Sequence, residues 1–294
     1  MTASTVRAET GRGVGVGAGA GRAPGPRGVG RRRARRIGDS LPAVLVFVGV
    51  VALWETVVGN LDVRGLPLPA PSQIVGALIE NWSGGRWPLG KAAAATLFEA
   101  IGGLAIGTTG GLVIAFLTAR FAAAREVLLP LAIAASAVPI IAFAPLMNNW
   151  FGVLNPLSKM MIVAVLVFFP VVVNVIRGLT QVEPAALELM RSYAASESTI
   201  LRVVRVPNAL PYFFTALKVS ATLSLIGAIV GEYFGGTSSV LGQVIVASAG
   251  SLRFDVTWAA IILGALTGIV FYLAIVVVER LVIPWHASVR GSEP

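Results

Sequence analysis

Cysteine is absent from this sequence, and histidine occurs once, as His286 near the C-terminus. The absence of cysteine excludes disulfide bonds and Cys-ligated zinc or iron–sulfur sites, and a single histidine leaves little for metal binding or histidine-based catalysis. We therefore expect no bound metal, no cofactor and no catalytic residue, and we do not expect an enzyme.

Charged residues are also scarce. They account for 13% of the 294 residues, whereas hydrophobic residues account for 56%, and the mean hydropathy is +0.83. Soluble domains carry roughly 25% charged residues. The composition therefore indicates a chain that sits in the lipid bilayer.

Six apolar runs predict six membrane-spanning helices, and hence an all-α membrane protein. A helix of about 20 apolar residues crosses the hydrocarbon core with its backbone hydrogen bonds satisfied internally. Pro130, Pro139 and Pro145 interrupt the third run. We expect a kinked helix there, because neighbouring membrane helices can satisfy the carbonyl groups that proline frees. The runs are Leu41–Gly59, Ala93–Thr118, Val127–Met147, Leu157–Ile176, Tyr212–Phe234 and Val256–Val278.

The distribution of lysine and arginine predicts the orientation, because cytoplasmic loops hold the excess of these residues. With the N-terminus inside, eighteen of the 23 basic residues fall in the inner segments. We therefore expect both termini in the cytoplasm. The outer segments would hold the remaining five, which are Arg64, Arg86, Lys91, Lys159 and Arg253.

Residues 1–40 are rich in glycine, arginine and proline, and they contain too few large apolar residues to form a core. We expect a disordered cytoplasmic tail. Its basic run, Arg31–Arg36, is expected to hold this end at the anionic inner leaflet, so lipid and not nucleic acid is the expected partner. Residues 286–294 are expected to form a short cytoplasmic C-terminal tail.

The segment "LPLPAPSQIVGALIENW" between the first two apolar runs predicts a short helix. Ser72 is placed to cap its first turn, and the helix would end at Asn81 or Trp82. Ile74, Leu78 and Trp82 would lie on one side. We expect this helix to rest on the outer surface of the bilayer.

Glycines recur every four residues in three of the apolar runs. Small residues at this spacing let helix backbones approach closely, which is how membrane helices associate without a hydrophobic driving force. The pattern predicts a compact bundle, although it does not say which helices pair. The residues are Gly103, Gly107 and Gly111, then Gly227, Gly231 and Gly235, and finally Gly264 and Gly268.

A polar segment, "EPAALELMRSYAASESTILRVVRVPNALPYFF", lies between the fourth and fifth runs. Pro184 suits the first turn of one short helix, and Ser196 or Ser198 can cap a second. Pro207 and Pro211 are expected to end that second helix before the chain re-enters the membrane. Two short amphipathic helices in the cytoplasm are typical ligands for a groove on a partner protein.

This segment resembles a loop of a known family. Permease subunits of binding-protein-dependent ABC importers carry the pattern EAA, three residues, Gly, nine residues, Ile-x-Leu-Pro. Here Glu188-Leu189-Met190 stands at EAA, Ala194 at the glycine, and Val204-Arg205-Val206-Pro207 at the end, with both spacings kept. Ala194 disfavours a sharp left-handed turn between the helices, because a Cβ costs energy there.

The amino-acid sequences of several segments look most like those of the nitrate, sulfonate and taurine branch of that family. These segments are "LELMRSYAAS", "VRVPNALPYFF", "LPAPSQIVGAL" and "APLMNNWFG". The resemblance covers roughly residues 41–285. It implies a six-helix permease domain of the bacterial plasma membrane, with cytoplasmic coupling helices in the loop at 183–207.

The resemblance also implies partners. Two permease copies, expected to be identical, would lie side by side, each docking its coupling helices into a cleft of an ATP-hydrolysing subunit, while an extracytoplasmic binding protein delivers the solute. The chain has no G-x-x-x-x-G-K-[ST] loop, so ATP must be hydrolysed by another subunit. Glu188 would be the polar contact at the cleft, with Arg191 and Arg202 as rim charges that steer docking. The remaining residues assigned to coupling are Leu187, Met190, Ala194, Val203, Val204, Val206 and Pro207.

Polar residues inside the apolar runs are candidates for the translocation path, because a charge in hydrocarbon costs at least about 2.5 kcal/mol. Glu99 and Glu232 could line the path or pair with a basic group such as Lys91 or Arg253, and pairing is the favoured interpretation. Glu55 and Lys218 are expected to snorkel from helix ends. The remaining path candidates are Asn174 in the fourth run and Asn148 and Asn149, which together with Trp150 would lie at the outer mouth or cap a helix end.

The substrate class stays open between nitrate, sulfonates or taurine and a small heterocycle such as a pyrimidine or a vitamin precursor. A proton-coupled secondary carrier is the alternative function. It predicts transport without an ATPase, and usually inverted repeats, which the sequence does not show. A membrane enzyme would need clustered histidines, cysteines or paired carboxylates, but the acids are scattered over different runs. Neither alternative accounts for the loop at 183–207.

Overall fold

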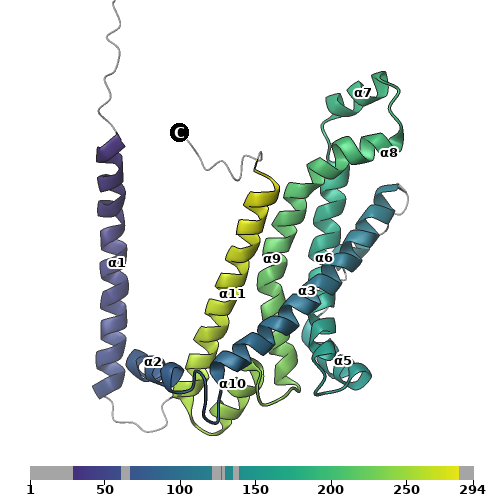
Figure 1. Cartoon of the computed structure of the whole chain (residues 1–294). Helices are drawn as coiled ribbons and strands as arrows, with labels where there is room; N and C mark the ends of the chain where they lie inside the picture. Colours follow the sequence, from purple (N-terminus) through teal and green to yellow (C-terminus); the bar gives the residue numbers. More distant parts are fainter. Residues whose placement is uncertain (1–28, 61–66, 121–126, 128–129, 135–138, 285–294) are drawn as a thin grey trace, which may run out of the picture. The chain divides into compact units, whose positions relative to one another are not determined.

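The computed structural model describes residues 29–60, 67–120, 127, 130–134 and 139–284. Within these ranges the regular structure is helical throughout, which confirms the all-α prediction (Figure 1). In chain order the elements are α1 (Val29–Asn60), α2 (Pro71–Glu80), α3 (Leu89–Arg120), η1 (Ile140–Phe143), α5 (Ala144–Phe151), α6 (Pro156–Thr180), α7 (Pro184–Ser192), α8 (Glu197–Ile200), η2 (Leu201–Arg205), α9 (Val206–Tyr233), α10 (Leu241–Gly250) and α11 (Phe254–Val282).

Five helical stretches in the described ranges are long and apolar enough to cross a membrane. Each corresponds to one of the six predicted runs. The spans are Pro42–Gly59 in α1, Leu89–Thr118 in α3, Pro156–Thr180 in α6, Glu197–Tyr233 in α8 to α9, and Phe254–Val282 in α11.

The third predicted run, Val127–Met147, is not among these spans. Part of it lies outside the described residues, and its described C-terminal portion forms the short 3-10 helix η1 and the start of α5. The six-helix count is therefore not confirmed. Asn148, Asn149 and Trp150 were predicted to follow this helix, and they lie inside α5 instead.

Residue contacts divide the chain at Ala52 into two units. The first unit contains most of α1, which begins at Val29 and so within the predicted tail. Residues 1–28 and 285–294 lie outside the described residues, and they include most of the predicted N-terminal tail and all of the predicted C-terminal tail.

In the second unit, α6 packs against both α3 and α9 (Figure 1). The glycine repeats explain this pairing, because those of α3 and α9 both face α6. A Cβ added at Gly107 would lie 2.9 Å from the Cα of Ala164, and one at Gly231 would lie 2.9 Å from Cδ1 of Ile162. The glycine spacing thus correctly predicted close packing, and the structure identifies α6 as the shared partner.

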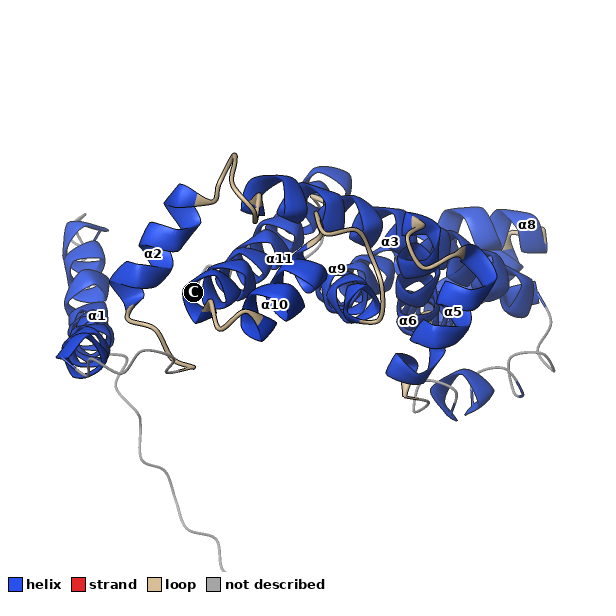
Figure 2. Ribbon diagram, turned by 90° about the horizontal axis from the view of Figure 1, so that it is seen from below, coloured by secondary structure: helices blue, strands red, loops and turns tan. Residues whose placement is uncertain are grey.

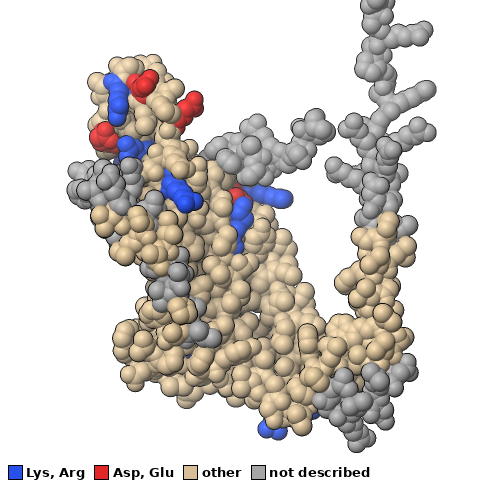
Figure 3. Space-filling model, turned by 180° about the vertical axis from the view of Figure 1, so that it is seen from behind, with Lys and Arg blue, Asp and Glu red and all other residues tan. Residues whose placement is uncertain are grey.

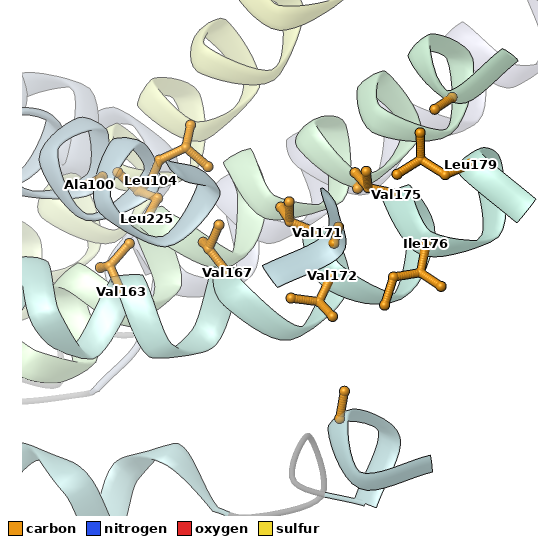
Figure 4. Close-up of a cluster of buried hydrophobic side chains, with 14 of the residues drawn as sticks. Ala100, Leu104, Val163, Val167, Val171, Val172, Val175, Ile176, Leu179 and Leu225 are labelled. Carbon is orange, nitrogen blue, oxygen red and sulfur yellow. The ribbon is translucent and has the colours of Figure 1, made fainter. Parts of the chain in front are cut away.

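The main apolar core follows α6 (Figure 4). Val163, Val167, Val171 and Val175 recur every four residues, so they form one buried stripe along the helix. Figure 4 shows the stripe running from Val163, near Leu104 and Leu225, to Val175, near Leu179. Since lipid is as apolar as the core, dispersion contacts between close helices hold this stripe together.

The short helices of the second unit gather at two opposite ends of the long ones. Helices α2, α5 and α10 lie at one end, and α7 and α8 lie at the other (Figures 1 and 2). On the face drawn in Figure 3, charged side chains gather toward the two ends and leave an uncharged band between them. An uncharged band of this kind is what the hydrocarbon of a bilayer requires.

The cap predicted for the short helix α2 is wrong. Ala70, not Ser72, precedes the helix, and Pro71 occupies its first turn. The backbone N–H of Ser72 donates to Glu55 Oε2 at 2.9 Å, and its hydroxyl donates to Glu55 Oε1 at 2.6 Å. The Glu55 carboxylate therefore lies at the N-terminus of α2, where the helix dipole favours a negative charge, and does not simply snorkel.

The apolar side of α2 was predicted to rest on the bilayer, but it packs against α11. Ile74 and Ala77 are buried in a cluster with Val256 and Ala260. Trp82, which was grouped with Ile74, is exposed.

The predicted stop at Pro207 and Pro211 is also wrong, because α8, η2 and α9 form one continuous helical stretch. Pro207 falls in the first turn of α9, where its missing N–H is not needed. The π-helical η2 directly precedes it, and such turns accommodate local changes in backbone pairing. Pro211 lies inside the helix, and proline is tolerated there in membrane helices.

Two predicted ionic arrangements need correction. Lys218 does not snorkel, because its ammonium group donates to both carboxylate oxygens of Glu279 on α11, at 3.0 and 2.9 Å. Arg253 does not reach Glu99 or Glu232, because it pairs with Asp255 at 3.0 and 2.9 Å. The hydrogen bonds that the Arg253 guanidinium donates to Asp255 raise its pKa.

Candidate functional site

Helix α7 projects from the bundle and buries none of its residues. Pro184 occupies its first turn, as the sequence predicts. Ser196 caps α8 by accepting a hydrogen bond from the backbone N–H of Thr199 at 3.3 Å, so the first of the two suggested caps is correct. The pair of short helices predicted for the loop therefore exists, although the second continues into α9.

The turn between α7 and α8 is left-handed in spite of its alanine. Ala194 has φ of 50°. Its N–H donates to the Arg191 carbonyl at 2.9 Å, and the N–H of Ala195 donates to the Met190 carbonyl at 3.0 Å. These two bonds form a Schellman motif, which usually has glycine at the left-handed position. Alanine thus changes the energy of this turn and leaves its geometry in place.

The apolar residues predicted to contact a partner divide into two sets. Val203 is exposed, whereas Leu187, Met190, Val204 and Val206 are half-buried. The residues that project most are Leu189 and Tyr193, which are 55% and 75% exposed. The prediction missed these two, although Leu189 of α7 and Tyr193, the residue that follows the helix, are four residues apart and so lie on one face.

The polar residues assigned to the loop lie on its surface. Glu188, Arg191 and Arg202 are exposed, and Pro207 is exposed at the start of α9. Arg205 forms an ion pair with Glu197 at 3.9 Å, which is long and exposed enough to contribute little to stability. Among the described residues, Glu188 forms no ion pair, so its carboxylate is available to a partner.

Asn208 fastens the loop to the bundle, a role that the sequence reasoning did not identify. Its side-chain amide donates to the carbonyl of Gly178 at 2.7 Å and to that of Gln181 at 3.1 Å. These carbonyls belong to the end of α6, where a helix leaves its last C=O groups without partners. The amide therefore joins the helix that enters the loop to the helix that leaves it.

A second candidate site is a buried cluster of three charged residues near the other end of the bundle. Glu99 of α3, Lys159 of α6 and Glu232 of α9 are 5%, 1% and 0% exposed. The Glu99 and Glu232 carboxylates lie close enough to act on each other electrostatically, and both act on Lys159. The basic residue whose charge acts on Glu99 and Glu232 is therefore Lys159, which was counted among the outer segments, and not Lys91 or Arg253. Among the described residues Lys159 forms no ion pair with either carboxylate.

The remaining path candidates contact backbone groups. Asn148 is buried and donates to the carbonyl of Phe234 at 3.2 Å. Asn174 donates to the carbonyl of Pro170 in its own helix at 2.8 Å. Asn149 is exposed on α5. The structure therefore brings Glu99 and Glu232 together, whereas Asn174 bonds within its own helix and Asn149 is exposed.

A family model described as binding-protein-dependent transport system inner membrane component matches residues 107–285, more than half of the chain. The chain belongs to this family. The match contains the whole loop from α7 to η2, as well as α6, α9, α10 and α11.

Named relatives of this permease transport different solutes. It is 28% identical over 248 residues, 84% of this chain and 90% of the relative, to the riboflavin transport system permease protein of Chloroflexus aurantiacus. It is 30% identical over 257 residues, which are 86% of this chain and 98% of the relative, to the formylaminopyrimidine transport permease protein of Halalkalibacterium halodurans. It is 29% identical over 255 residues, which are 86% of this chain and 89% of the relative, to a putative aliphatic sulfonates transport permease protein of Bacillus subtilis.

Membership of the family places this permease in the inner membrane as a multi-pass protein and makes it a transport component. It also implies two kinds of partner, a subunit that hydrolyses ATP and a protein that binds the solute outside the membrane.

Proposed function

We propose that this permease forms the translocation path of an ATP-driven importer. The loop from α7 to η2 would transmit the conformational change that accompanies ATP hydrolysis in the partner subunit. The observation that supports this most directly is the loop itself. It places an unpaired carboxylate, Glu188, beside two large exposed apolar side chains, Leu189 and Tyr193, on a helix that buries nothing. Apolar side chains on an exposed helix are typical of a surface that docks in a partner's groove.

The attachment of the loop supports a role in transmitting motion. Asn208 holds the start of α9 to the end of α6, and a Cβ at Gly178 would lie 2.7 Å from the Cα of Ala209. A displacement of α7 by a partner would therefore reach α6 and α9 together, since both helices leave from the same rigid junction.

We propose that α7 and α8 lie in the cytoplasm, with both termini on the same side. The basic residues Arg177, Arg191, Arg202 and Arg205 occupy this end of the chain's fold. An excess of arginine near the ends of spanning helices supports a cytoplasmic location. We further propose that a second, identical copy completes the path, as two permeases side by side are the arrangement that the resemblance implies.

The docking surface is proposed to consist of Glu188, Leu189, Tyr193 and Val203, with Arg191 and Arg202 at its rim. The half-buried side chains of Leu187, Met190, Val204 and Val206 are proposed to support this surface from within the loop. Ala194 and Pro207 are proposed to set the direction of α7 relative to α9.

For the substrate, we propose a small nitrogen heterocycle of the pyrimidine or flavin type. The alignments to the riboflavin and formylaminopyrimidine permeases cover 90% and 98% of those relatives. Among the described residues, the buried charged side chains are three carboxylates, Glu99, Glu232 and Glu279, and one lysine, Lys159. They do not form a basic site suited to an anion. Sulfonates are the second candidate, supported by the sulfonate permease of Bacillus subtilis.

Co-purification with the ATPase subunit of the same transport system tests this proposal. The wild-type permease is expected to retain the ATPase through detergent extraction, and Glu188→Arg and Tyr193→Asp are expected to lose it. Glu80→Arg is a matched control, because Glu80 is an exposed carboxylate on α2 at the opposite end of the unit. Retention of the ATPase by both loop variants would contradict the proposed docking surface.

A further inference from the structure

We propose that Glu99, Lys159 and Glu232 form a lock that holds α10 and the loop at 152–155 closed over one end of the bundle, and that transport requires this lock to loosen. The three residues come from three different helices and are all buried. The part of the proposal that concerns transport rests on the proposed importer function, whereas the part that concerns the position of α10 does not.

The lock holds the N-terminus of α10. Val240 stands at the N-cap position of α10, and its side chain does not cap the helix by a hydrogen bond. Instead, the N–H of Gly242 donates to Glu232 Oε2 at 2.6 Å, and the N–H of Leu241 donates to the hydroxyl oxygen of Thr96 at 3.0 Å. The first amides of a helix have no partner within it, so α10 depends on α9 and α3 for them.

The fit at this contact is close. A Cβ at Gly242 would lie 2.7 Å from the Ile229 carbonyl and 2.9 Å from Glu232 Oε2. Glycine is therefore required for the helix terminus to reach the carboxylate. A carboxylate at a helix N-terminus also gains from the helix dipole, which is equivalent to about half a positive charge.

The same cluster holds the loop between α5 and α6. The ammonium group of Lys159 donates to the carbonyl of Val153. Gly235, which follows α9 with φ of 155°, packs against Val153, and Asn148 donates to the carbonyl of Phe234. The ends of α5, α9 and α10 are thus connected through Glu232, Lys159 and Asn148.

The charges within the lock are unequal. Two carboxylates face one ammonium group, and one oxygen of each, Glu99 Oε2 and Glu232 Oε1, has no hydrogen-bond donor among the described residues. Removing Lys159 would leave two buried carboxylates without a counter-charge, which is strongly unfavourable. Removing the charge of Glu99 would relieve their repulsion. A role in packing alone would not give these opposite effects.

Hydrogen–deuterium exchange of the purified permease in lipid nanodiscs tests the lock. Lys159→Met keeps the length of the side chain, and it is expected to raise exchange of the α10 amides at least about tenfold. Glu99→Gln is expected to leave that exchange unchanged or to slow it. Lys218→Met is the matched control, because it breaks a different, partly buried ion pair and should leave the α10 amides unchanged.

Three results would overturn the lock. One is an unchanged α10 in Lys159→Met, another is a rise of equal size in Glu99→Gln, and the third is a rise spread over α3, α6 and α9 as much as α10. If Lys159→Met does not fold, Thr96→Val decides the question, because it removes the hydroxyl that accepts from the Leu241 N–H and also interacts with the Glu232 carboxylate of the lock. A rise of several-fold confined to α10 supports the lock, and no rise overturns it.

The transport part is tested in proteoliposomes that contain the permease, its ATPase and its binding protein, with riboflavin, a formylaminopyrimidine and taurine as probes. Lys159→Met is expected to continue hydrolysing ATP while the solute moved per ATP falls at least about tenfold, because α10 no longer closes its end of the path. A loosened α10 with an unchanged ratio would overturn the transport part. If the wild-type complex moves none of the probes, the proposed function fails, and the exchange experiment still decides the lock.

Discussion

Replacing Ala194 by glycine is expected to stabilise the turn between α7 and α8. Ala194 holds φ of 50°, where a Cβ crowds the following carbonyl. Relief of that crowding contributes about 1–2 kcal/mol, and the greater freedom of glycine in the open loop offsets about 0.5–1 kcal/mol of it. The net gain should be about 0.5–1 kcal/mol, which corresponds to a roughly two- to fivefold change in an equilibrium constant.

Hydrogen–deuterium exchange of the Ala194 and Ala195 amides measures this gain. Both amides are bonded to carbonyls of α7, so they exchange only when the turn opens. Ala194→Gly should slow their exchange by about two- to fivefold. Ala194→Val should speed it, because a β-branched residue fits the left-handed region poorly.

The neighbouring residue provides the control. Ala195 does not have a positive φ. Ala195→Gly should therefore destabilise the turn, since it adds freedom to the open loop and relieves no crowding. If Ala194→Gly leaves the exchange unchanged or speeds it, the left-handed turn derived from the structure is refuted.

Three further predictions concern contacts within the bundle. Asn208→Ala should lower the free energy of unfolding by about 1–3 kcal/mol, because it leaves two carbonyl groups at the end of α6 without their donor; equilibrium unfolding in detergent with Asn208→Asp and Asn208→Gln alongside measures it, and full stability in Asn208→Ala would contradict the junction. Lys218→Met should lower the free energy of unfolding by about 3–5 kcal/mol, since it leaves Glu279 buried and unpaired. The double variant with Glu279→Gln should recover most of this loss in the same assay. Losses that simply add in the double variant would count against the pair. Gly107→Leu should separate α3 from α6 and cost at least about 1–3 kcal/mol, whereas Gly76→Leu, where no atom lies within 4 Å of an added Cβ, should cost less than about 1 kcal/mol; equal losses would contradict the close packing of α3 on α6.

The spanning helices were largely predictable because the pattern that defines them is local. A run of apolar residues is sufficient to form a helix in hydrocarbon, and five of the six predicted runs are spans in the structure. The bounds shifted outward, as in α6, which extends to Thr180, four residues past the predicted end at Ile176. Polar residues at helix ends remain helical because they lie beyond the apolar core.

The errors in the local structure arose from residues whose role depends on a distant partner. Ser72 has the chemistry of a helix cap, but Glu55, 17 residues away, binds it from another helix. Pro207 has the chemistry of a helix stop, but it falls at a position where its missing N–H is not needed. Neither outcome can be read from the neighbouring sequence.

The candidate sites were predictable to different degrees. The loop pattern placed α7, its first turn and its exposed carboxylate correctly, because these depend on a short stretch of chain. The buried cluster was not predictable, since Glu99, Lys159 and Glu232 are separated by 60 and 73 residues and meet only when α3, α6 and α9 pack together. Lys159 was counted among the outer segments because it stands in the first turn of α6, at the edge of the predicted run Leu157–Ile176.

Uptake into proteoliposomes tests most directly whether this chain is the permease of an ATP-driven importer. The vesicles would hold the permease and its ATPase, with the loaded binding protein outside and ATP inside. We predict solute uptake that requires ATP and is lost in Glu188→Arg but retained in Glu80→Arg. Uptake by the permease alone, driven by a proton gradient and indifferent to Glu188→Arg, would contradict the proposed function.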